Sequence, residues 1–306
     1  MATAEQIRSL VDGFSMETTP ATAAKVASFK TLLAAGTAVS VTFLPGSDWR
    51  DTVATSARLR TEGMVPVPHI AARSIPDEAM LDTYLAALQA EARVDRALIV
   101  GGGVSRPVGR FDRSMQLLET GLFEKYGIRR IGVAGHPEGT PDIPPAEVER
   151  ALLDKAAYAR ATGAEMYLVT QFCFEAAPVA AWLERLRSIG VHLPVWIGVP
   201  GPATLRTLLR YAQECGIGPS MRVVTRQARN LAKLLTVQTP DALLAGLADR
   251  QALDPERRLR GIHVYAFGGF AKTSGWFGAV RDGRFALTRG GKGFALDDAA
   301  AAAAAS

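Results

Sequence analysis

Cysteine is nearly absent from this chain of 306 residues, which contains only Cys173 and Cys215. Two cysteines are too few for a disulfide framework, and both stand in apolar or helical stretches. We therefore expect reduced thiols with structural roles, and we expect Cys173 in the core and not as a nucleophile.

Long hydrophobic runs are missing as well. No apolar run approaches the length that crosses a bilayer, and no apolar segment follows a basic start at the N-terminus. We expect a cytoplasmic protein with no membrane partner. Hydrophobic residues nevertheless make up 48% of the chain, which at this length suits one large barrel or two ordinary domains.

The excess of positive charge is small, with 35 basic against 30 acidic residues and a net charge of +5. Arginines are spread singly through helical stretches, and the denser group at 222–233 is interleaved with apolar residues at helical spacing. This pattern favours solvated helix faces over a stripe that follows phosphates, so we expect no nucleic-acid partner. A mild positive field would suit anionic small substrates.

The motifs of several reaction classes do not occur. The four histidines, His69, His136, His192 and His263, match no metal-ligand spacing, so we expect no metal site. No G-x-S-x-G and no Cys–His nucleophile arrangement is present. Residues 101–106 read GGGVSR and do not complete the dinucleotide fingerprint G-x-G-x-x-G.

What the sequence does contain is a regular alternation of apolar strand patterns and helix patterns. Strands are predicted at 13–17, 38–44, 65–71, 96–100, 129–135, 166–174, 194–199 and 261–267. Helices are predicted at 1–10, 22–35, 48–62, 77–92, 112–126, 145–162, 177–189, 203–215 and 270–280, with a helical insertion at 220–253. Eight strand–helix units in about 280 residues predict closure into a barrel and not an open sheet.

We therefore predict a single (β/α)8 TIM barrel over residues 1–290, with a helical insertion before strand 8. Residues 291–306 form a low-complexity, alanine-rich tail to which no chemistry is assigned.

Conspicuous polar residues and glycines collect at or near the C-terminal ends of the predicted strands. They are Glu17, Thr42, His69, Gly101, Gly102, Gly103, His136, Glu138, Thr170, Gln171 and Tyr265. Active sites of such barrels are built at this end of the strands, so a ligand site is predicted there.

A few of these residues limit the kinds of reaction that the site can catalyse. Glu17, one carboxylate among Thr, His, Gln and aromatic neighbours, suits a single general acid or base beside a bound heterocycle. Thr170 and Gln171 end a buried strand, where a polar pair either binds a ligand or satisfies neighbouring backbone groups, and both interpretations remain open. For His69, a core histidine and a ligand contact also remain open.

Five short segments, in order along the chain, resemble motifs of the methylenetetrahydrofolate reductase family, of the bacterial kind that has only the catalytic domain. SMETTP at 15–20 resembles the family's F-E-F-F-P-P, SVTF at 40–43 resembles S-V-T-Y, and PVPHI at 66–70 resembles A-A-P-H-L. VAGHPEGTP at 133–141 is similar to V-A-x-Y-P-E-x-H-P, and VTQFCF at 169–174 to I-T-Q-F-F-F. The resemblance runs from about residue 14 to residue 279.

The resemblance implies reduction of 5,10-methylenetetrahydrofolate to 5-methyltetrahydrofolate by NAD(P)H, normally through bound FAD. Glu17 would be the general acid that protonates the bridge nitrogen of the folate. Gln171 would hydrogen-bond the pterin or nicotinamide, and Leu205 would pack on the ligand. Thr170 and Phe174 complete the substrate side that we assign.

The cofactor side is assigned by the same resemblance to Thr42, His69, Gly101, Gly102, Gly103, His136 and Lys155. Here the chain departs from the family: the usual R-G-D after strand 4 is replaced by the glycine triplet, and His136 stands where a tyrosine is usual. Lys155 is the nearest basic candidate for the FAD pyrophosphate.

These departures leave two routes for the electrons: through FAD in a modified pocket, which is the route we expect from the resemblance, or, as the alternative, directly from NAD(P)H to the folate. A barrel that binds folate without catalysis is the hypothesis from another class. NADH against NADPH, the direction of the reaction, and assembly as a monomer or homo-oligomer stay open.

Overall fold

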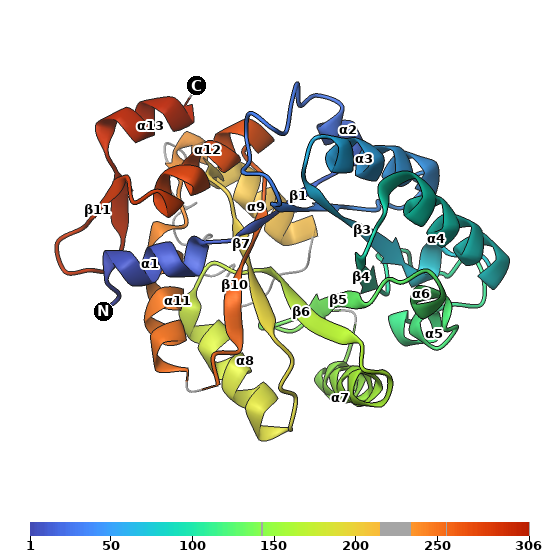
Figure 1. Ribbon diagram of the computed structural model, residues 1–306. Coiled ribbons are helices and arrows are strands. Elements are labelled where there is room, and N and C mark those ends of the chain that lie inside the picture. The colour runs from blue at the N-terminus through green and yellow to red at the C-terminus, as the bar shows by residue number, and fades with distance from the viewer. Residues whose placement is uncertain (142, 215–233, 255, 306) are drawn as a thin grey trace. The chain divides into compact units, whose positions relative to one another are not determined.

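Eight parallel strands form a closed barrel in the computed structural model, which describes residues 1–141, 143–214, 234–254 and 256–305 (Figure 1). The strands are β1 (Ser15–Thr18), β2 (Ala38–Val41), β3 (Val65–Ala71), β4 (Arg96–Val100), β5 (Arg130–Gly135), β6 (Glu165–Phe172), β7 (Val195–Pro200) and β10 (Leu259–Tyr265). Around the barrel they follow the order β1, β10, β7, β6, β5, β4, β3, β2. The predicted (β/α)8 barrel is confirmed.

The helices that alternate with these strands lie close to the predicted ranges. They are α1 (Ala4–Val11), α3 (Trp49–Thr61), α4 (Glu78–Ala92), α7 (Pro145–Thr162), α8 (Ala176–Ser188), α9 (Leu205–Glu214), α11 (Asp241–Leu253) and α12 (Phe270–Arg281). Local sequence explains their starts: Asp48 caps α3 and Asp77 caps α4, each accepting a hydrogen bond from a backbone N–H of the first turn. None of the described helices is long and apolar enough to cross a membrane.

The helix predicted at 22–35 was wrong. Only the short helix α2 (Pro20–Ala23) forms, and turns follow it. The guanidinium of Arg58 donates to the carbonyl oxygens of Ala23, Val26 and Ala27, and the carboxylate of Glu62 accepts from the backbone N–H of Phe29. Hydrogen bonds to side chains of the next helix thus replace those that a longer helix would make.

The helix predicted at 112–126 is divided in two. The pieces are α5 (Ser114–Leu118) and α6 (Leu122–Lys125), with Gly121 between them at a φ of 71°. That left-handed conformation favours glycine and interrupts the helix. Further along, Cys215 and residues 220–233 of the predicted insertion lie outside the described residues.

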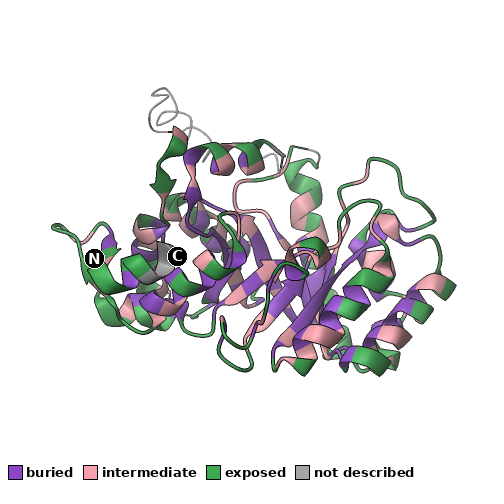
Figure 2. Ribbon diagram, turned by 90° about the horizontal axis from the view of Figure 1, so that it is seen from above, coloured by how far each residue is buried: buried purple, intermediate pink, exposed green. Residues whose placement is uncertain are grey.

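The chain divides into two compact units. Unit 1 comprises Met1–Phe14, Gly135–Arg150 and Thr170–Ser306, and unit 2 comprises Ser15–Ala134 and Ala151–Val169. In Figure 2 the strands are largely buried, while the helices alternate buried and exposed faces. This is the expected division between a barrel core and its helical cover.

One apolar set of unit 2 comes from its strands alone and is here called the interior cluster. It consists of the buried Val67, Leu98 and Val169, with Ala38, Val100 and Tyr167 packed against them. These residues come from β2, β3, β4 and β6 at alternate positions, as expected for the inward-facing side chains of barrel strands.

Residues 291–306, expected as a tail, contain two regular elements within unit 1. β12 (Phe294–Leu296) pairs antiparallel with β11 (Phe285–Leu287), and α13 (Asp298–Ala305) follows. Phe294 and Ala300 are buried, and Phe294 stacks against Trp276 of α12 with ring centroids 5.7 Å apart. The boundary predicted at residue 290 falls in the loop of this hairpin.

Candidate functional site

Glu17 lies on the inward face of β1. Strand β1 pairs in parallel with β2, and Glu17 stands opposite Ser40. Ser40 is two residues from Ala38, which packs against the interior cluster, so all three side chains share one face of the sheet. The side chain of Glu17 is 18% exposed, which places a carboxylate in the barrel interior with limited access to water.

His69 faces the same carboxylate from β3. Its imidazole Nε2 lies 3.8 Å from Glu17 Oε2, and its side chain is 9% exposed. We call these two residues the Glu17–His69 pair. The distance is longer than a hydrogen bond, and the pair is ionic when the imidazole is protonated. In the part of the chain described, no group of three or more His, Cys, Asp and Glu side chains could hold a metal ion.

Thr42 follows β2 directly and presents a buried hydroxyl. Its backbone N–H donates to the carbonyl oxygen of Thr18 at 2.8 Å, which continues the pairing with β1. The Oγ1 atom of Thr42 has no hydrogen-bond partner among the described residues. A buried hydroxyl without a protein partner is expected to meet water or a ligand.

The middle residue of the glycine triplet after β4 has a backbone conformation that favours glycine. Gly102 has a φ of +97°, and a Cβ there would lie 3.1 Å from the Cβ of Ala71. A Cβ at Gly101 or Gly103 would meet no described atom within 4 Å. Gly102 is therefore needed for the turn, whereas open space lies beside its two neighbours.

Lys155 is buried on the inward side of α7, together with Leu152 and Ala156. Burial lowers the pKa of its ammonium group to about 8, and the nearby Asp154 opposes this shift only partly. The side chain is 8% exposed. Lys155 does not present an accessible cation to a pyrophosphate, contrary to the role expected for it.

The arginines near the end of β4 are mostly engaged by protein groups. Arg73 donates to the carbonyl oxygens of Asp112 and Val104. The two arginines that follow in the loop form ion pairs, Arg110 with Glu78 and Arg113 with Asp112. Arg106, whose side chain is exposed, is the remaining cation of this loop and makes no ion pair with the described residues.

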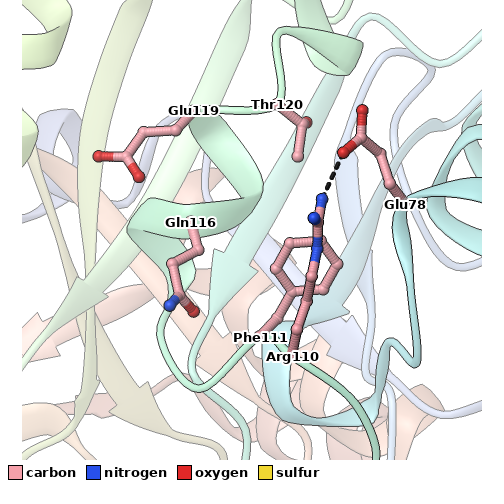
Figure 3. Close-up of a pocket in the computed structure, with 6 residues that line it drawn as sticks. All are labelled: Glu78, Arg110, Phe111, Gln116, Glu119 and Thr120. Atoms are coloured by element: carbon pink, nitrogen blue, oxygen red, sulfur yellow. Dashed lines mark hydrogen bonds and ion pairs between the residues drawn. The ribbon is translucent and has the colours of Figure 1, made fainter.

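A shallow hollow of about 320 Å³ lies where the C-terminal end of this loop meets α4 and α5 (Figure 3). It is lined by Glu78, Arg110, Phe111, Gln116, Glu119 and Thr120. The guanidinium of Arg110 pairs with Glu78 and lies 4.9 Å from the centroid of the Phe111 ring. None of the residues predicted from the sequence lines it, so we do not assign the predicted chemistry to this hollow.

Gln171 is the polar residue of unit 1 that is best placed for a ligand. By the alternation of a strand it lies on the same face of β6 as Tyr167 and Val169, two members of the interior cluster. Its Oε1 atom accepts a hydrogen bond from the backbone N–H of Phe172 at 3.1 Å. The amide nitrogen has no partner among the described residues and is the end open to a ligand.

Thr170 points to the other face of β6. Its side chain is fully buried, and its hydroxyl donates to the carbonyl oxygen of Gln171 at 2.8 Å and accepts from the N–H of Gly198 at 2.8 Å. The sequence left two interpretations open for Thr170, and the structure supports the second: its hydroxyl satisfies neighbouring backbone groups. We remove it from the substrate-binding residues and retain Gln171.

Five aromatic side chains of unit 1, from the last residues of β6 and β10, the segments just after them, and α9, pack together. This five-ring cluster consists of Phe172, Phe174, Tyr211, Tyr265 and Phe267. Phe172 contacts three of the others, with ring centroids 4.8 to 5.6 Å apart. Tyr211 of α9 stacks on Phe267 with centroids 4.1 Å apart and planes inclined by 15°.

The hydroxyl of Tyr265 ties this cluster to the strand that carries Gln171. It donates to the carbonyl oxygen of Thr170 at 3.0 Å. A Cβ at Gly198 of β7 would lie 2.5 Å from that oxygen. The lack of a side chain at Gly198 therefore leaves the oxygen accessible to Tyr265.

Leu205 is more buried than its predicted role as a ligand contact requires, whereas the cofactor role predicted for His136 stays a prediction. Leu205 begins α9 and is 1% exposed, so its side chain packs in the protein and offers no free surface to a ligand. His136 follows β5, is half-buried, and accepts a hydrogen bond from the N–H of Gly139 at its carbonyl oxygen. We do not retain Leu205 as a ligand contact.

Sequence reasoning did not assign three members of the five-ring cluster to the site: Phe172, Tyr211 and Phe267. Phe267 lies two residues after Tyr265, so the period of a strand continued past its end could have indicated it. Tyr211 is one polar-tipped aromatic residue on an amphipathic helix, and nothing local in the sequence distinguishes it.

No protein-family model matches the chain. Among solved structures, the chain is similar to Yersinia pestis DHPS with the pterine-sulfa conjugate Compound 16. The two chains share 15% sequence identity and a TM-score of 0.43, over 89% of this chain and 95% of that one.

Proposed function

We propose that the barrel reduces 5,10-methylenetetrahydrofolate to 5-methyltetrahydrofolate with NAD(P)H, and that Glu17 is the general acid. The observation that carries the proposal is the Glu17–His69 pair: a carboxyl group with limited access to water, on the inward face of β1, beside an imidazole. A carboxyl group with limited access to water, placed beside a bound substrate, can act as a general acid. The five motif resemblances support the same reaction.

The proposed chemistry needs one proton and one hydride. Glu17 gives its proton to the bridge nitrogen, and the five-membered ring opens to an iminium ion. The hydride from C4 of NAD(P)H then reduces the iminium carbon to a methyl group, which leaves NAD(P)+ and an ionised Glu17. A positioned acid typically contributes about 10²- to 10⁴-fold to such a step.

Gln171 and the five-ring cluster are the residues that we propose for contacts with the substrate ring. The amide nitrogen of Gln171, which has no partner in the part of the chain that is described, can donate to a ring oxygen or nitrogen of the pterin. The half-exposed rings of the five-ring cluster, Phe174 and Tyr265 among them, supply flat apolar surface of the kind that stacks against a planar heterocycle.

The residues of the chain fit the FAD of the resembling family poorly. An FAD pyrophosphate needs donors and positive charge that offset its desolvation. Lys155 is buried, and Arg73, Arg110 and Arg113 are engaged by protein groups, so among the described cations at the end of β4 the exposed Arg106 remains. The proposal therefore takes the hydride directly from NAD(P)H and routes no step through FAD.

Substitution of the acid tests the proposal. We expect Glu17→Gln to lower the rate of substrate-dependent NAD(P)H oxidation by about 100-fold or more, because the amide cannot donate the proton. Folate binding, measured by isothermal titration, is expected to persist. The matched control is Glu165→Gln, an exposed glutamate on β6, which should keep the full rate. A wild-type protein that binds folate and shows no activity would instead favour the non-catalytic barrel.

A further inference from the structure

We propose that His69 supplies the proton that restores Glu17 after each turnover, a role that rests on the proposed reductase function. Each reduction would leave Glu17 as a carboxylate in a region with little water. A group that returns a proton to it must lie within reach of its oxygen atoms. Nε2 of His69 lies 3.8 Å from Glu17 Oε2, and that nitrogen is itself buried.

The backbone holds the two residues in a fixed relation. Strand β2 lies between their strands, with Glu17 opposite Ser40 on one side and Val41 opposite Pro68 on the other. A small side-chain rotation closes 3.8 Å to hydrogen-bond range, and such contacts often tighten only when a substrate is bound. No movement of the strands is required.

Few other ionisable groups lie on the strands around the pair. The strand between them, β2, carries none. On β4, the other neighbour of β3, Arg96 stands at the first position and pairs with Asp95. On β10, next to β1 in the barrel order, the titratable side chains are His263 and Tyr265, with Arg260 near its start. Helix α3 packs beside β3 and carries Arg50 and Asp51 in its first turn and Arg58 and Arg60 in its last turn, of which Arg58 pairs with Glu62.

The proton balance closes over one cycle. Glu17 loses its proton to the bridge nitrogen, and the imidazolium of His69 then passes the proton on Nε2 to the carboxylate. His69 becomes neutral and takes a proton from solvent. No oxidant or further reactant is needed, and the hydride step is unchanged.

The test compares His69→Gln with the wild type across pH. Glutamine keeps a hydrogen-bonding side chain but cannot carry the proton. We expect kcat to fall about 10- to 100-fold with KM nearly unchanged, and the decline of wild-type kcat as pH rises through the titration of His69 to disappear. In His69→Ala, added imidazole should restore part of the rate. The matched control is His192→Gln, which breaks the exposed pair of His192 with Glu256.

An unchanged kcat and pH profile in His69→Gln, or no rescue by imidazole, would overturn the proposal. A readout without catalysis separates this failure from that of the reductase function. In NMR titrations of the intact protein, the midpoint of the His69 ring resonances should move to lower pH in Glu17→Gln, because a neighbouring negative charge is lost. An unmoved midpoint would show that the side chains of Glu17 and His69 do not interact electrostatically. It would contradict the proposal whatever reaction the barrel catalyses.

Discussion

Gly102, at the centre of the glycine triplet, adopts a backbone conformation that other residues rarely take. Its φ of +97° penalises a side chain, as does the 3.1 Å that would separate an added Cβ from the Cβ of Ala71. We predict that Gly102→Ala lowers the free energy of unfolding by about 1–2 kcal/mol, measured by urea denaturation. Gly103→Ala is the matched control, because no described atom lies within 4 Å of its added Cβ. Equal losses in the two variants would contradict a conformational role for Gly102.

Thr170 shows a second single-residue effect, this time through hydrogen bonding. Thr170→Val would leave the N–H of Gly198 and the carbonyl oxygen of Gln171 without their buried partner. The expected loss of unfolding free energy is about 1–3 kcal/mol. Thr83→Val, at an exposed helical threonine that donates to Ala79, should change stability far less. If Thr170→Val leaves the free energy of unfolding unchanged, water must replace the hydroxyl as the hydrogen-bond partner.

Thr170 and Gln171 show how far the role of a single residue can be predicted from sequence. Both are polar residues at the end of one strand, and the sequence left ligand binding and backbone satisfaction open. Alternation places them on opposite faces of β6, but which face is inward depends on pairing with other strands. That information is not contained in the stretch itself.

At the scale of elements, helix α7 carries a buried charge that should make stability depend on pH. Burial lowers the pKa of Lys155 to about 8 from an ordinary 10.5, so the unfolded chain binds more protons between these values. Stability should therefore rise as pH increases from about 8 to 10.5, by at most about 3 kcal/mol from this group. Lys155→Met should remove that part of the rise and be more stable than the wild type at pH 7. Lys25→Met, at an exposed lysine, should retain the wild-type slope.

The five-ring cluster leads to a prediction about ligand binding by α9. Tyr211 stacks on Phe267, which in turn contacts Phe172 and Tyr265. We expect Tyr211→Ala to weaken binding of a tetrahydrofolate about three- to tenfold, because the stacked ring surface is lost. Tyr211→Phe keeps the ring and should bind as the wild type does. Both affinities are measured by isothermal titration, and equal affinities in Tyr211→Ala and the wild type would exclude α9 from the ligand surface.

Element prediction succeeded where local signals and tertiary contacts agree. Asp48 and Asp77 stand just before α3 and α4, where an N-cap residue is expected, and both side chains cap their helices in the structure. The helix predicted at 22–35 failed because Arg58, more than thirty residues away in sequence, takes the carbonyl groups that the helix needed. Contacts of that range leave no mark in the local pattern.

At the scale of the whole molecule, the count of alternating units was enough to predict the closed barrel. Barrel closure follows from eight strand–helix repeats, which the sequence displays directly. The accessibility of Lys155 and Leu205 was not predictable in the same way, because burial depends on how each helix turns against its strand. The fold was therefore easier to predict than the surfaces that a ligand can reach.

The reductase proposal is tested most directly by following a deuterium label from C4 of NAD(P)H. Wild-type protein would be incubated with the labelled nucleotide and 5,10-methylenetetrahydrofolate in ordinary water, without added flavin, and the folate product analysed by mass spectrometry. We predict 5-methyltetrahydrofolate that retains the label in its methyl group, because the hydride passes directly between the two ligands. Product without the label would contradict direct transfer, since hydrogen on a reduced flavin exchanges with water. No methyl product, with or without added FAD, would contradict the proposed reaction itself.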